Sequence, residues 1–69
     1  MKTSDISDAQ VVDACRRSHD GGVREAAGDI LYRETGAPPK VVFRAMERSY
    51  RRDLINFGGS LWTAWPESA

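Results

Sequence analysis

The chain has 69 residues, of which 41% are hydrophobic and 29% charged, and its ten basic residues balance its ten acidic ones. This composition is typical of a soluble globular protein, because a disordered chain has fewer apolar residues and a larger charge imbalance. The length predicts one domain, residues 1–69, too small to form an enzyme cleft between two lobes. The balanced charge argues against a protein that coats nucleic acid through bulk charge.

Cys15 and His19 are the only cysteine and the only histidine, which excludes an internal disulfide and a thiolate metal site. No second histidine or cysteine completes a catalytic relay, so we expect a non-enzymatic protein without metal or cofactor. No apolar run approaches the roughly 20 residues that span a bilayer, and the first residues lack the apolar stretch of a signal peptide. We therefore expect a cytoplasmic protein with no membrane partner.

The first predicted helix covers about residues 8–19. Ser7 stands three residues before Gln10, a capping-box spacing in which each side chain can bond the other's free backbone N–H. Ile6 and Val11 flank this box at the spacing of a hydrophobic staple. The helix would bury Val11, Val12 and Cys15, and the glycine pair at 21–22 would end it.

The second predicted helix covers about residues 23–35. Val23, Ala27, Ile30 and Leu31 recur at helical spacing, and Gly36 follows as a C-terminal cap. The small residues at 26–28 would let another helix approach closely. Asp29 can pair with Arg33 one turn later.

The third predicted helix covers about residues 39–53 and begins at the pair Pro38-Pro39, because proline is tolerated in the first turn only. At about 100° per residue its side chains divide into two faces. The apolar face contains Val42, Phe43, Ala45, Met46 and Tyr50. The basic face contains Lys40, Arg44, Arg48, Arg51 and Arg52.

The last segment, about 54–65, reads as a β-hairpin around a Gly58-Gly59 turn. In this register Phe57 faces Ser60 and Ile55 faces Trp62, and Pro66 ends the second strand. The predicted fold class is therefore mainly α with a C-terminal β-hairpin.

Three helices followed by a hairpin is the element order of a winged helix-turn-helix. Residues 44–55 resemble the recognition helix of that superfamily and its run into the wing, with Ser49 where leucine is usual and Asp53 where glycine is usual. Residues 35–48 resemble the corresponding part of small proteins encoded by phages or prophages. The resemblance implies a three-helix winged helix-turn-helix that binds double-stranded DNA with its third helix in the major groove.

The residues that this resemblance assigns to the groove and the phosphates are Lys40, Arg44, Arg48 and Arg51. Arg52, which continues the basic series, and Ser60, on the wing, are further candidate DNA contacts. Charge spacing gives an independent reason, since like charges four residues apart destabilise a helix and only Glu47 relieves them. An anionic partner is the simpler explanation, and arginine matches guanine edges or phosphate through paired bonds.

Two alternatives stay open. The basic face could be solvated or paired with the acidic first half, within the fold or across a dimer. The scaffold could also serve a protein-binding adaptor or inhibitor of a host or phage protein, because fold alone does not fix function. The segment 54–65 contains no Lys or Arg, so a monomer would bind DNA weakly, and we expect a homo-oligomer such as a homodimer. The leading hypothesis is a phage-type transcriptional regulator.

Overall fold

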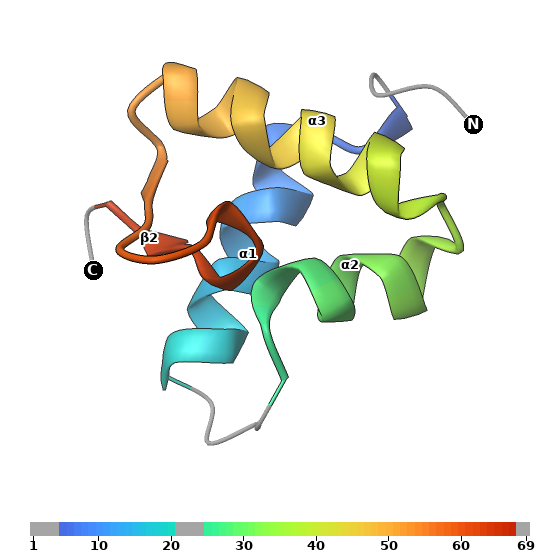
Figure 1. Cartoon of the computed structure of the whole chain (residues 1–69), viewed down its shortest axis with the longest axis horizontal. Coiled ribbons are helices and arrows are strands. Elements are labelled where there is room, and N and C mark those ends of the chain that lie inside the picture. Colours follow the sequence, from blue (N-terminus) through green and yellow to red (C-terminus); the bar gives the residue numbers. More distant parts are fainter. Residues whose placement is uncertain (1–4, 21–24, 68–69) are drawn as a thin grey trace.

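The computed structural model describes residues 5–20 and 25–67, in which three helices pack around one core and a short hairpin lies at one end (Figure 1). The helices are α1 (Asp8–Asp20), α2 (Ala27–Thr35) and α3 (Pro39–Arg51). They are followed by β1 (Ile55–Asn56), the 3₁₀ turn η2 (Leu61–Thr63) and β2 (Trp65–Pro66). In Figure 1 α3 runs along the upper edge, with α2 below it and α1 behind.

The start of α1 confirms the predicted capping box. The Ser7 N–H donates to Gln10 Oε1 at 2.8 Å, and the Gln10 N–H donates to Ser7 Oγ at 3.2 Å. Ile6 and Val11 are both buried on either side of this box, as the staple spacing predicts. These local bonds fix the position of Asp8, the first residue of the helix.

The second helix is shorter than predicted, because it begins at Ala27 rather than near residue 23. Ala26, directly before it, has an extended backbone, while Val23 and the glycines at 21–22 lie outside the described residues. The predicted C-terminal cap is confirmed: Gly36 has a φ of 70°, and its N–H donates to the Tyr32 carbonyl at 3.0 Å. That turn leads through Ala37 and Pro38 directly into α3.

Helix α3 begins at Pro39 as predicted, but its buried face is narrower than expected. Val42, Ala45, Met46 and Ser49 are buried. Phe43 and Tyr50 were expected on this face, but 42% and 41% of their surfaces are exposed. Each lies roughly 100° from the centre of the buried strip, beyond the reach of α1 and α2.

The helix also ends at Arg51 rather than residue 53. Asp53 adopts a φ of 60°, its N–H donates to the Tyr50 carbonyl, and the Leu54 N–H donates to the Ser49 carbonyl. This pair of bonds is a Schellman motif, in which the left-handed position is usually glycine. Asp53 therefore adopts the backbone conformation of the residue it replaces in the resembled pattern.

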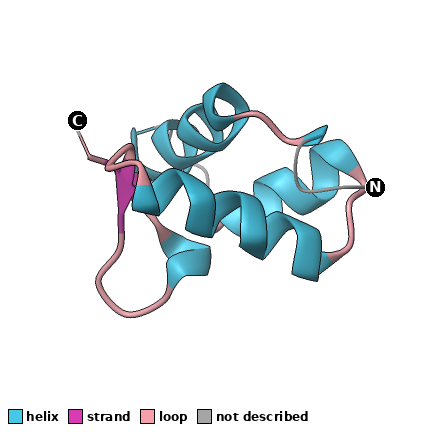
Figure 2. Cartoon of the chain, turned by 90° about the horizontal axis from the view of Figure 1, so that it is seen from above, coloured by secondary structure: helices cyan, strands magenta, loops and turns pink. Residues whose placement is uncertain are grey.

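The C-terminal antiparallel hairpin is confirmed, but its predicted register is wrong. Ile55 pairs with Pro66 and Asn56 with Trp65, so an eight-residue loop that contains η2 joins the strands (Figure 2). The tight Gly58-Gly59 turn, with Ile55 opposite Trp62, does not form.

A tertiary contact decides this register. Trp62 packs on Gly28 of α2, where a Cβ would overlap its indole ring, and its Nε1 donates to Asp29 at 2.9 Å. The small residues of α2 thus accommodate an indole ring from the hairpin loop. Leu61 and Ala64, on either side of this contact, are buried in the core. Cys15 is also buried, as predicted, and burial raises the pKa of its thiol to about 11.

Candidate nucleic-acid interface

The exposed side of α3 opposite the core carries four charged residues, which we call the outward stripe: Lys40, Arg44, Glu47 and Arg51. Their spacing of four, three and four residues keeps them on one face of the helix. Helix α3 runs along an outer edge of the molecule (Figure 1). Lys40 and Arg44 form no ion pair with the described residues, so their charges are available to an external anion.

Glu47 and Arg51 form the one ion pair within the outward stripe. Arg51 Nη2 lies 3.6 Å from Glu47 Oε1, and 74% of the Arg51 side chain is exposed. The distance is too long for a hydrogen bond, so the pair is a weak, solvated one. Both groups therefore keep hydrogen-bonding capacity for a ligand.

The flank of α3 that faces α1 has a different arrangement, which we call the Asp8 cluster: Asp8, Arg48, Ser49 and Arg52. Arg48 Nε donates to Asp8 Oδ1 at 2.9 Å, and the buried Ser49 hydroxyl donates to the same oxygen at 2.8 Å. Arg52 Nη1 donates to Asp8 Oδ2 at 2.5 Å. Arg48 Nη2 also donates to the carbonyl of Ile6. The first residue of α1 thus holds the C-terminal half of α3.

These donors determine the ionisation of Asp8. Burial by itself raises the pKa of this carboxyl, but hydrogen bonds from Ser49, Arg48 and Arg52 outweigh it and lower the pKa from 3.8 to about 2. Asp8 is therefore fully charged at neutral pH. Because three donors share its two oxygens, loss of that charge would weaken all three contacts.

The cluster shows that the basic face predicted for this helix is not uniformly open to solvent. Only 24% of the Arg48 side chain is exposed, and its guanidinium is held by Asp8 and Ile6. Arg48 is adjacent to the buried strip of α3, so its side chain reaches the start of α1 and not the outer face. The alternative that the acidic half of the chain pairs with this helix is thus confirmed for Arg48 and Arg52.

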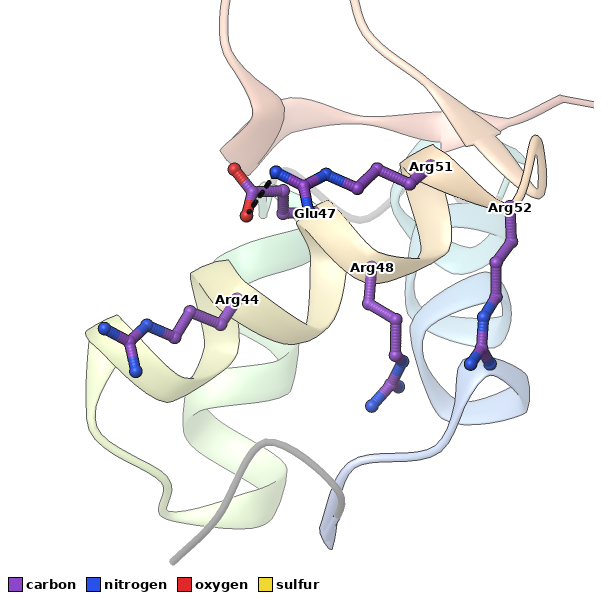
Figure 3. A pocket seen from close by; sticks show the side chains of 5 residues that line it. All are labelled: Arg44, Glu47, Arg48, Arg51 and Arg52. Carbon is purple, nitrogen blue, oxygen red and sulfur yellow. Dashed lines mark ion pairs between the residues drawn. The ribbon is translucent and has the colours of Figure 1, made fainter.

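A hollow of about 420 Å³ on α3 is lined by four of the six predicted contact residues, Arg44, Arg48, Arg51 and Arg52, together with Glu47. Figure 3 shows that their guanidinium groups do not converge. Arg51 is directed toward Glu47, Arg48 and Arg52 are directed toward the start of α1, and Arg44 extends away from the others. The side chains thus form a spread basic surface and not a cage around one anion.

Lys40 and Ser60, the other two predicted contact residues, do not line this hollow. Lys40 lies in the first turn of α3, one turn before Arg44. Ser60 lies on the hairpin loop, where its hydroxyl oxygen accepts from the Trp62 N–H at 3.3 Å and caps η2. Its neighbours Gly58 and Gly59 are exposed, so backbone groups and small side chains form the tip of this loop.

Sequence reasoning missed a second hollow, of about 520 Å³, between α3 and the hairpin loop. Its apolar lining comes from Phe43, Tyr50, Phe57 and Leu61. Its polar lining comes from Glu47, Arg51 and Ser60. The Tyr50 and Phe57 rings meet edge to face with centroids 5.0 Å apart. The apolar residues at positions 43 and 50 of the sequence were the available signal, but helical periodicity assigned them to the core.

Several acidic residues of the first half form ion pairs around α1 and α2. Arg17 donates to both carboxylate oxygens of Glu34 at 2.6 Å, and Arg33 donates to Glu25. The predicted contact of Arg33 with Asp29 is replaced by this Glu25 pair, because Asp29 accepts from Trp62. In the described part of the chain, no three His, Cys, Asp or Glu residues are placed to hold a metal ion.

Comparison of the chain with models of known protein families, with curated proteins and with solved structures gives no match. Within residues 5–20 and 25–67, every helix is too short or too polar to cross a bilayer. The functional evidence in this chain is therefore the arrangement of side chains on α3 and around it.

Proposed function

We propose that this protein is a small DNA-binding regulator of the winged helix-turn-helix type, which places α3 in the major groove of duplex DNA. The observation that carries the proposal is the outward stripe, where Lys40 and Arg44 have no carboxylate partner among the described residues. An α-helix fits a major groove about 12 Å wide, and lysine and arginine side chains reach its base edges and phosphates.

The arrangement around α3 supports this type of fold. A three-residue turn, 36–38, joins α2 to α3, as in helix-turn-helix units that hold a second helix against DNA. The hairpin follows α3 directly, in the position of a wing. Its exposed tip at Gly58, Gly59 and Ser60 would approach the sugar-phosphate backbone with neutral groups only.

Three cations would contact DNA in this arrangement, Lys40, Arg44 and Arg51, because Arg48 and Arg52 are bonded to Asp8. Each phosphate contact lowers log K by about 0.9 per decade of salt, so one chain would bind weakly and its affinity would fall steeply with salt. We propose that two chains bind together as a homodimer, which doubles the contacts and is common among regulators of this type. Transcriptional regulation of phage type is the function that the resemblance of residues 35–48 implies.

The test is fluorescence anisotropy of a labelled random-sequence duplex at low salt, with thermal unfolding of each variant by circular dichroism. We expect Lys40→Ala with Arg44→Ala to abolish most binding, because it removes the two unpaired cations of the outward stripe, and to leave unfolding nearly unchanged. Arg16→Ala is the matched control, since Arg16 is also an exposed arginine but lies on α1. Absence of binding by the unaltered protein, or equal losses in the double variant and the control, would refute the proposal.

The apolar hollow favours a second candidate function, a protein-binding adaptor. Phe43 and Tyr50 expose apolar surface beside Phe57 and Leu61, and such hollows accept apolar side chains of a protein partner. If the protein does not bind duplex DNA at low salt, protein binding through this hollow becomes the favoured function.

A further inference from the structure

The basic residues of α3 are not equivalent, because the Asp8 cluster restrains some of them and leaves others unrestrained. Arg48 and Arg52 are bonded to Asp8, so neither guanidinium can turn to the outer face without losing that contact. The groups that remain on the outer face are those of the outward stripe. On the basis of the proposed function, we infer that Arg44 and Glu47 select the DNA sequence by reading a guanine and a cytosine on neighbouring base pairs.

Arg44 is the cation best placed to read a base. It lies in the middle of α3 on the outer face, and its side chain extends away from the other arginines (Figure 3). It has no ion pair with the described residues, so its planar set of N–H donors is free. That set matches the two acceptors, O6 and N7, that only guanine presents in the major groove.

Glu47 is the residue that makes the reading selective. A carboxylate in the centre of a DNA-facing surface is repelled by phosphates, so it lowers affinity for every sequence that offers it no donor. In the major groove, guanine and thymine present oxygen acceptors, whereas cytosine and adenine each present an amino group. Adenine also presents the N7 acceptor beside its amino group, which repels the second carboxylate oxygen, so cytosine is the better partner of a carboxylate. The Glu47 oxygens can accept from the cytosine amino group, because the 3.6 Å contact with Arg51 is an ion pair without a hydrogen bond.

The spacing of the two residues fits adjacent base pairs. Three residues along an α-helix correspond to an advance of about 4.5 Å. Successive base pairs of duplex DNA are about 3.4 Å apart. Side chains of this length and flexibility absorb the difference, so Arg44 and Glu47 would contact neighbouring steps. Lys40 and Arg51, near the ends of the stripe, would then contact phosphates.

The experiment is selection of bound sites from a pool of randomised duplexes, followed by anisotropy on the selected duplex and on single-base changes of it. The unaltered protein should enrich sites with adjacent guanine and cytosine, and changing either base should weaken binding by roughly 5- to 100-fold. Glu47→Gln should lose the cytosine preference, favour adenine at that position, and bind random duplex more tightly. Arg44→Gln should lose the guanine preference. Lys40→Gln is the matched control, which should weaken all sequences equally.

The outcomes separate this inference from the proposed function. If the protein binds duplex but Glu47→Gln and Arg44→Gln keep the same base preferences, the assignment of these two residues is wrong and DNA binding stands. If the unaltered protein binds no duplex at low salt, both proposals fail. Both variants alter exposed side chains, so unchanged unfolding curves would show that any shift in preference is not a folding defect.

Discussion

The substitution Asp8→Asn neutralises the carboxylate that joins α1 to α3. Its effect on the free energy of unfolding tests whether the Asp8 cluster forms. The folded-state pKa of Asp8 is about 2, against an ordinary value of 3.8. The difference corresponds to about 2 kcal/mol of folding free energy at neutral pH. Asp8→Asn removes this charge and leaves Arg48 without its carboxylate, so we expect a loss of about 2 kcal/mol and a fall in Tm of roughly 10 °C.

The same reasoning predicts how the effect depends on pH. Because the pKa is lowered in the folded state, the stabilisation is present above pH 3.8 and is lost as the pH falls toward 2. About half of it should be lost by pH 3. Urea unfolding of the unaltered protein and of Asp8→Asn between pH 3 and pH 7 measures this dependence. The difference between their free energies of unfolding should become smaller as the pH falls.

The matched control is Asp13→Asn, which removes an exposed carboxylate paired with Arg17 on α1. Such a pair contributes about 0 to 1 kcal/mol, so the control should unfold almost like the unaltered protein. A difference between Asp8→Asn and the unaltered protein that stays constant from pH 3 to pH 7, or a loss no larger than that of the control, would refute the Asp8 cluster.

Substitutions at Gly28 and Asp53 and the reactivity of Cys15 test the packing and the backbone. Gly28→Ala should destabilise the fold by about 1 to 2 kcal/mol in urea unfolding, because the new methyl group overlaps the Trp62 ring. In a protein that already carries Trp62→Leu, Gly28→Ala should destabilise the fold much less. Asp53→Gly should stabilise the fold by up to about 1 kcal/mol, because glycine adopts a φ of 60° without steric cost, whereas Asp53→Ala should not stabilise it. Equal stability of these two variants would contradict this. The Cys15 thiol should react slowly with a disulfide reagent at pH 8 and rapidly in urea, because burial raises its pKa to about 11.

The features that could be predicted from the sequence depend on residues close together in the chain. The Ser7 and Gln10 capping box, the Gly36 cap and the start of α3 at Pro39 all formed as expected. Each involves bonds or steric limits within a few residues, so its outcome does not depend on the rest of the fold. Asp53 adopts the left-handed conformation at the position where the resembled pattern has glycine, through bonds that also lie within a few residues.

The features that could not be predicted depend on contacts between distant segments. The hairpin register follows from Trp62, which packs on Gly28 more than thirty residues earlier. The contacts of Arg48 and Arg52 with Asp8 join residues at least 40 positions apart, and they hold two arginines of a helix face that periodicity treats as uniform. The sequence shows which residues are basic or aromatic and on which helix face they lie. Their contact partners depend on how the helices pack against one another.

The central claim is that duplex DNA contacts the outward stripe of α3, and mapping the contact by NMR tests it most directly. Titration of ¹⁵N-labelled protein with a short duplex at low salt should shift the signals of Lys40, Arg44, Glu47 and Arg51 first. The Arg17 and Glu34 signals, from the ion pair between α1 and α2, should stay in place. Shifts centred on that pair, or none anywhere on α3 at saturating duplex, would contradict the account.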